Sequence, residues 1–260
     1  RRNKLSINLS VNYSNSTQNG RSPSQSTFSG MNNLFYSVWG YRPVTQPGVP
    51  LSYLKDNAFD DNVDSSVDYR FNPILSLENE NVKNNTTYVQ FNGFTEYEFI
   101  KGLKLKVSGG YTTDFRKFEN FNNSNSRYGS PLSIDKVNAT VRNSQRLTWL
   151  NENILTYQTT IKKKHSINSL LGITFQNSDY KYYSTKTTQI PNESLGMAGM
   201  AQGMPNLNES AHLEWSMMSY LGRVNYNYMS KYYATASFRA DGSSKFRGNN
   251  LYGYFPSASL

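Results

Sequence analysis

The segment Leu5–Tyr13, which reads LSINLSVNY, alternates one apolar residue with one serine or asparagine over its whole length. Successive side chains of a β-strand point to opposite faces, so this segment would have one apolar and one polar face. The same period of two recurs along the chain, broken at Phe94 and Leu170. It predicts strands near residues 89–99, 103–115, 167–176, 220–228 and 234–239, and we place one more between 141 and 157, where the pattern blurs.

The connections between these strands differ in length at the two ends. Short ones lie near 100–102, 161–164 and 229–231, and long ones near 16–85, 119–139, 185–213 and 242–253. Transmembrane β-barrels combine short periplasmic turns with longer extracellular loops, and strands of about 10–16 residues are long enough to cross a bilayer at a tilt. We therefore predict an all-β fold, an antiparallel transmembrane β-barrel segment of about eight strands with long extracellular loops. Aromatic residues near the strand ends suit interfacial girdles: Tyr13, Tyr97, Phe99, Tyr157, Tyr226, Tyr228 and Tyr232.

A soluble antiparallel sandwich is the alternative fold, because its strands also alternate between apolar and polar residues. The long strands and the one-sided loops favour the barrel. The apolar face also carries small residues that suit lipid better than a packed aliphatic core: Gly93, Gly109, Gly222, Ala234 and Ala236.

The composition disfavours an ordinary soluble enzyme. Only 37% of the residues are hydrophobic and 17% are charged, whereas soluble domains have about 45–50% and about 25%. The 20 tyrosines and 14 phenylalanines argue against disorder. The net charge of +9 comes from scattered residues, with Lys162–Lys164 as the longest basic run, so no nucleic-acid partner is expected. The chain begins at Arg1 without an initiator methionine, so we expect it to be processed or part of a longer protein.

No catalytic arrangement is recognisable in the sequence. The two histidines, His165 and His212, have no partner at a suggestive spacing, and nucleophile-elbow, phosphate-loop and zinc motifs are lacking. We expect neither an enzyme nor a bound cofactor.

A constellation near the end of the sequence resembles a known family. Ser219–Tyr226 reads SYLGRVNY, Lys231–Phe246 reads KYYATASFRADGSSKF, and Gly253–Ser257 reads GYFPS. Together they resemble the barrel of the SusC/RagA family of TonB-linked (TonB-dependent) outer-membrane proteins of Bacteroidetes-type bacteria. Asn72–Glu78 (NPILSLE) and Glu98–Leu105 (EFIKGLKL) are similar to earlier segments of the same barrel.

The resemblance implies a multi-pass barrel of about 22 strands with an N-terminal plug in the bacterial outer membrane. It implies nutrient uptake of oligosaccharides or peptides under a SusD-like surface lipoprotein, energised by TonB-ExbB-ExbD through the plug, with a dimer of SusCD pairs as a further expectation. Residues 1–260 would then be a partial TonB-dependent receptor β-barrel domain that lacks the plug and the remaining strands.

The alternative function is a surface adhesin or structural β-protein that binds glycans through aromatic loops. Under either function the candidate binding rings lie in the loop 16–85, because such rings stack on sugars or anchor partners, or else pack the loop itself. They are Phe35, Tyr36, Trp39 and Tyr41.

Cations on the polar face would line the lumen, where they could attract acidic substrate groups or, as we favour, pair with carboxylates of the plug. These are Lys104, Lys106, Arg116, Arg223 and Arg239, of which Arg223 and Arg239 are candidate binding residues. Met197, Met200 and Met204 either pack a loop or offer an adaptable surface to a partner. Clustered carboxylates in the first loop form a speculative Ca²⁺ site without EF-hand spacing: Asp56, Asp60, Asp61, Asp64 and Asp68.

Overall fold

The structure is a computed structural model that describes residues 4–20, 34–41, 47–48, 50, 72–248 and 251–260. It contains eight strands: β1 (Leu5–Asn19), β2 (Glu80–Ile100), β3 (Leu103–Asn122), β4 (Asn138–Ile161), β5 (His165–Thr188), β6 (Met204–Tyr228), β7 (Tyr232–Ser243) and β8 (Tyr252–Ser259). The described residues also form the short α-helices α1 (Leu34–Gly40) and α3 (Pro73–Asn79) and the 3₁₀ helix η1 (Glu193–Gln202), which lie between strands.

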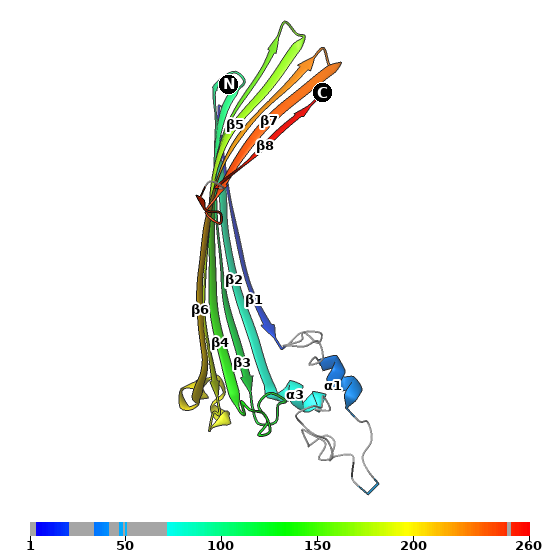
Figure 1. Cartoon of the computed structure of the whole chain (residues 1–260), viewed down its shortest axis with the longest axis vertical. Helices are drawn as coiled ribbons and strands as arrows, with labels where there is room; N and C mark the ends of the chain where they lie inside the picture. Colours follow the sequence, from blue (N-terminus) through cyan, green and yellow to red (C-terminus); the bar gives the residue numbers. More distant parts are fainter. Residues whose placement is uncertain (1–3, 21–33, 42–46, 49, 51–71, 249–250) are drawn as a thin grey trace.

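The strands form one antiparallel sheet in which each strand pairs with its neighbour in sequence, in the order β1 to β8. The sheet is strongly twisted, and the helices lie at the end opposite the short turns (Figure 1). The strands β1 and β8 form its two edges, so the sheet is open among the described residues. The predicted all-β, antiparallel architecture is confirmed, including the strand in the blurred stretch, which is β4.

Tight turns join the strands at one end. Lys164 N donates to Ile161 O at 3.1 Å and Lys231 N donates to Tyr228 O at 3.0 Å. The two central residues of each turn have positive φ, at 50° and 57° for Lys162 and Lys163. This is the type I′ turn whose twist matches that of the flanking strands.

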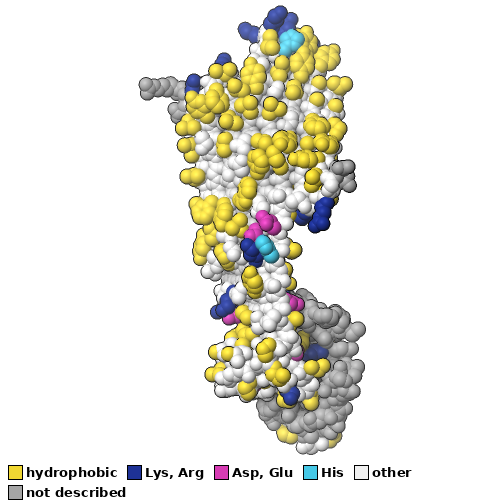
Figure 2. All heavy atoms as spheres, turned by 60° about the vertical axis from the view of Figure 1, so that its left-hand side comes forward, with side chains coloured by type: hydrophobic (Ala, Val, Ile, Leu, Met, Phe, Trp, Pro, Cys, Tyr) yellow, Lys and Arg dark blue, Asp and Glu magenta, His cyan; other side chains and the backbone are white. Residues whose placement is uncertain are grey.

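One face of the sheet carries an apolar band in the half nearest these turns (Figure 2). The register aligns one residue of each strand from β1 to β6 on this face: Leu9, Gly93, Gly109, Asn151, Phe175 and Met218. Leu9 is 82% exposed, and a soluble protein rarely leaves so many large apolar side chains in water. The girdle aromatics fall on this face as well, and Tyr97 and Phe99 pack edge to face at 5.0 Å. We call this the outer face and the opposite one the polar face.

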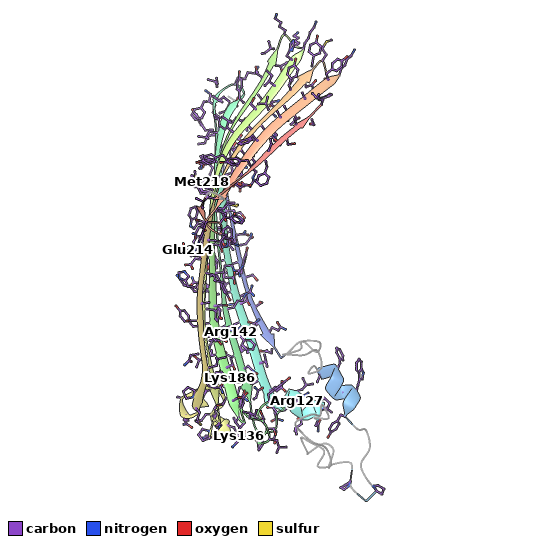
Figure 3. All side chains as sticks on the ribbon, in the orientation of Figure 1. Arg127, Lys136, Arg142, Lys186, Glu214 and Met218 are labelled. Carbon is purple, nitrogen blue, oxygen red and sulfur yellow. The ribbon has the colours of Figure 1, made fainter. Side chains whose placement is uncertain are left out.

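The apolar band covers only part of each strand. On β5 it runs from Ile167 to Phe175, a length that fits a tilted crossing of about 9–11 residues. Beyond it the outer face becomes polar, and Figure 3 places Glu214 on the loop side of Met218. The strands β2 to β6 are 20–25 residues long.

The predicted strand and loop lengths therefore need correction. Residues 16–19, 80–85, 119–122, 185–188 and 204–213 extend strands and do not belong to loops. The sequence hides these extensions because neither face of the sheet is apolar there, which removes the alternation that marks a strand.

Two loops pack together at the far end of the sheet. Phe121, Ala139 and Ile190 form a small buried cluster, against which Met197 and Met200 lie. Glu193 fixes η1 to the neighbouring loop, because its carboxylate accepts hydrogen bonds from Ser124 N and Oγ at 2.8 and 3.0 Å. Loop packing is thus the role of Met197 and Met200, whereas Met204 begins β6 and is exposed.

Among the described residues, no helix is long and apolar enough to cross a membrane.

Candidate functional site on the polar face

The polar face contains ion pairs that lie along the strands. Lys104 Nζ donates to Glu96 Oε1 at 2.8 Å across β2 and β3. Arg239 Nε donates to both carboxylate oxygens of Asp241, at 2.8 and 2.9 Å. Arg116 Nε lies 3.2 Å from Asp114 Oδ1. These side chains are partly exposed, so each pair contributes only about 0–1 kcal/mol to stability. They neutralise much of the charge that the face would present.

Cations of the same face also lie over aromatic rings. Lys106 Nζ is 4.4 Å from the centre of the Phe94 ring. Arg146 and Arg142 lie 5.0 and 5.3 Å from the rings of Tyr180 and Tyr182. A ring on a polar wall offers a flat surface to a sugar or a peptide side chain, and the cation beside it supplies hydrogen-bond donors. Phe94, which breaks the alternation of β2, is explained by this contact with Lys106.

The five predicted lumen cations all fall on the polar face, because they alternate with the outer-face residues in the register. Lys104, Arg116 and Arg239 pair within the sheet, and Lys106 stacks on Phe94. Arg223 lies between Leu170 of β5 and Ser237 of β7, and no described residue gives its side chain a hydrogen bond or ion pair. A binding role for Arg223 and Arg239 stays a prediction.

The helix α1 carries the predicted aromatic residues. Phe35 and Trp39 stack with ring centres 6.1 Å apart, and Trp39 is 76% exposed. Tyr41, directly after the helix, is half-buried, and the side chain of Tyr36 lies outside what the structure describes. A binding role for Trp39 and its neighbours stays a prediction.

The predicted Ca²⁺ site falls outside the described residues, with all of its five carboxylates: Asp56, Asp60, Asp61, Asp64 and Asp68. Within the described ranges, His, Asp and Glu form no group of three or more that could hold a metal ion. The calcium hypothesis therefore stays a prediction.

Both histidines make structural contacts. His165 Nδ1 lies 2.7 Å from the Tyr226 hydroxyl near the short turns. His212 Nε2 lies 2.8 Å from Asp179 Oδ1 on the outer face, beyond the apolar band. The hydrogen bond from Lys181 lowers the pKa of the Asp179 carboxyl against the opposing effect of desolvation, and His212 contributes less.

The sequence analysis missed Arg142, Arg146, Tyr180 and Tyr182, because they lie where the alternation is weak. A usable signal exists in the turn. The three residues Lys162–Lys164 separate the paired residues Ile161 and His165, and counting back from this pair places Arg146 opposite Tyr180.

Comparisons with known proteins agree with this fold. The TonB-dependent receptors P26 and P3 of Formosa agariphila are 29% and 27% identical over 96% and 99% of this chain. The TonB-dependent receptor SusC of Bacteroides thetaiotaomicron is 44% identical over 45 residues, 17% of this chain and 4% of SusC. The chain spans about a quarter of the length of the two Formosa receptors. No protein-family model matches it.

Among solved structures, the RagAB peptide transporter superposes with a TM-score of 0.64 at 21% identity. The superposition covers 72% of this chain and 21% of that one, and at this identity it bears on the fold alone. The relatives are receptors and transporters, and they support an outer-membrane location. Taken with the antiparallel sheet, its apolar outer face and its polar face, these matches support a stretch of the β-barrel of a SusC/RagA-type TonB-dependent receptor.

Proposed function

We propose that this chain belongs to an outer-membrane TonB-dependent importer of the SusC type, which takes up oligosaccharides or peptides. The observation that carries the proposal is a sheet with an apolar band on its outer face and a polar opposite face, with tight turns at one end and packed loops at the other. Such a wall encloses a polar lumen within lipid. The relatives reported above are named as receptors or transporters and none as an adhesin, so we favour import over the adhesin alternative.

Residues 1–260 would be part of the barrel domain of a longer protein, whose plug and further strands lie elsewhere. The plug would couple the importer to TonB-ExbB-ExbD, and a SusD-like lipoprotein would cover its extracellular side, with pairs assembling as dimers. The RagAB transporter is named for peptides, whereas the cation–ring pairs of the polar face suit sugars and peptides equally.

An uptake experiment tests the function. We expect deletion of the gene for the full-length receptor to abolish growth on one class of substrate, oligosaccharide or peptide, when that class is the sole carbon source. The intact gene should restore growth, and a protonophore should stop accumulation of the labelled substrate, because import requires the proton gradient. Growth without the gene on every substrate of both classes, or recovery of the receptor from the aqueous fraction without detergent, would show that the proposal is wrong.

A further inference from the structure

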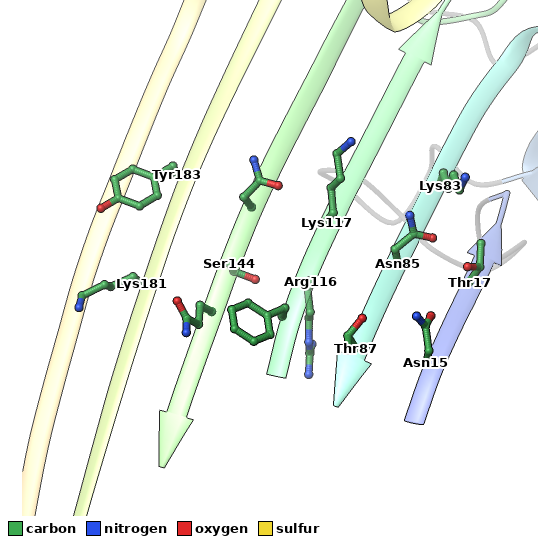
Figure 4. Close-up of a pocket in the computed structure, with 13 residues that line it drawn as sticks. Asn15, Thr17, Lys83, Asn85, Thr87, Arg116, Lys117, Ser144, Lys181 and Tyr183 are labelled. Atoms are coloured by element: carbon green, nitrogen blue, oxygen red, sulfur yellow. The ribbon is translucent and has the colours of Figure 1, made fainter. Parts of the chain in front are cut away.

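A hollow of about 710 Å³ lies on the outer face, immediately beyond the apolar band. Its lining comes from neighbouring strands β1 to β5 (Figure 4). On β1, Tyr13 ends the apolar band and Asn15, the next residue on that face, already lines the hollow. The hollow therefore starts at the height at which lipid chains give way to headgroups, and a substrate inside the lumen faces the opposite side of the wall.

The outer-face side chains of this hollow suit a phosphorylated sugar. Lys83, Lys117 and Lys181 line it, and no carboxylate does. Phe115 and Tyr183 add rings that can lie against sugar faces, and amide and hydroxyl groups supply neutral donors and acceptors: Asn15, Thr17, Asn85, Thr87, Asn143 and Gln145. Arg116 and Ser144 also border the hollow, but the register assigns their side chains to the polar face.

The lysines are available to an incoming anion. Lys117 pairs with Glu119 at 2.7 Å and Lys181 with Asp179 at 2.8 Å; the lysine side chains are 50% and 43% exposed and the carboxylate side chains 20% and 27%. Exposed pairs of this kind are worth about 0–1 kcal/mol, so a phosphate with its greater charge can draw the ammonium groups toward itself. Lys83 is exposed and has no ionic partner among the described residues.

One polar atom of the lining lacks a partner. Asn85 Oδ1 is buried and accepts no hydrogen bond within the described part of the chain. A buried group left unsatisfied costs about 1–3 kcal/mol. The side-chain amide can present either its oxygen or its nitrogen, so a sugar hydroxyl or a phosphate oxygen in the hollow can satisfy it.

From this geometry we infer that the hollow binds the phosphorylated sugar headgroup of an outer-leaflet glycolipid, whose acyl chains lie along the apolar band below. We choose a glycolipid as the occupant because the hollow is continuous with the apolar band. The cationic, sugar-compatible lining begins one outer-face position beyond Tyr13 and directly borders the exposed band of Leu9 and Val11. A volume of this size falls within the range of about 300–1,000 Å³ typical of small-molecule sites.

The test compares glycolipid binding by the full-length receptor and a triple variant, Lys83→Gln/Lys117→Gln/Lys181→Gln. Purified lipopolysaccharide is the probe, and its enzymatically dephosphorylated form is the second arm. We expect the triple variant to bind lipopolysaccharide about tenfold more weakly, equivalent to about 1.4 kcal/mol. The matched control, Lys162→Gln/Lys163→Gln/Lys164→Gln, removes three lysines at the opposite end of the strands and should bind like the wild type. The dephosphorylated form should bind the wild type as weakly as lipopolysaccharide binds the triple variant.

Three results would overturn the inference: unchanged binding by the triple variant, displacement of lipopolysaccharide by an equal concentration of inorganic phosphate, or a variant that loses only its dimeric state. The first removes the role of the lysines, the second assigns the site to free phosphate, and the third assigns it to a second copy of the receptor. Heat-modifiable migration shows whether the triple variant folds. If it does not, lipopolysaccharide binding by the single variant Lys83→Gln is compared with the wild type, because Lys83 has no described ion pair to lose. That single change should still weaken binding measurably.

Discussion

At the residue scale, some cations of the polar face pair with carboxylates within the sheet, and Arg223 does not. Arg239 is held by both oxygens of Asp241, whereas Arg223 has no partner among the described residues. If a plug carboxylate completes the lumen, Arg223→Gln removes a charge-assisted hydrogen bond of about 1.5–3 kcal/mol. We expect this variant of the full-length receptor to admit large hydrophilic antibiotics, measured as increased susceptibility of cells.

Arg239→Gln is the matched control, because Arg239 pairs with Asp241 of the same sheet and its loss removes no contact with the plug. It should leave susceptibility unchanged. Equal susceptibility of the two variants would mean that Arg223 does not hold the plug.

The sequence predicts individual residues well where one face is apolar. The alternation placed Lys104, Arg223 and Arg239 on the correct face, and it marked Phe94 as an exception that the structure explains through Lys106. Pairings such as Arg142 with Glu209, at 3.4 Å, could not be predicted, because they depend on the register between strands that are far apart in sequence.

At the element scale, the tight turns hold non-glycine residues in a left-handed conformation. Met229 and Ser230 have φ of 52° and 56°, which costs residues other than glycine or asparagine roughly 1–2 kcal/mol each. Met229→Asn/Ser230→Gly supplies the preferred type I′ pair. We expect the free energy of unfolding of this variant to be about 1–2 kcal/mol higher. Urea titration of the folded receptor in lipid vesicles measures this as unfolding at a higher urea concentration.

Lys231→Gly is the control for this turn, since Lys231 is not among the residues with positive φ. Glycine there should lower stability by about 0.5–1 kcal/mol, because it only adds freedom to the unfolded chain. A stabilising effect of both changes would show that turn conformation is not the cause.

Strand existence and order were predictable at this scale, and strand length was not. β5 was expected near 167–176, and the structure extends it from His165 to Thr188. The extension has polar residues on both faces and is held by pairing with β4 and β6 rather than by burial of apolar side chains. Nothing in the local sequence signals such pairing.

At the scale of the whole molecule, the apolar band locates the membrane, and two positions of β5 test it. Leu171 lies within the band and Tyr183 beyond it, both on the outer face and nearly equally exposed, at 63% and 65%. Arginine at the bilayer midplane of a barrel costs about 2–4 kcal/mol, and about 0–1 kcal/mol near the interface. Leu171→Arg should therefore destabilise the receptor in lipid vesicles by about 2–4 kcal/mol in urea titrations.

Tyr183→Arg, on the same strand and face, should cost no more than about 1 kcal/mol, because its side chain remains among headgroups or water. In a soluble sandwich the apolar face would form the packed core. The loss of stability on introducing arginine would then depend on how deeply each position is buried and not on its depth in a membrane. Equal losses at the two sites, or a harmless Leu171→Arg, would contradict the assignment of this band to lipid. The comparison thus separates the barrel from the sandwich on one strand, because the introduced arginine and the exposure are matched while the distance from the short turns differs.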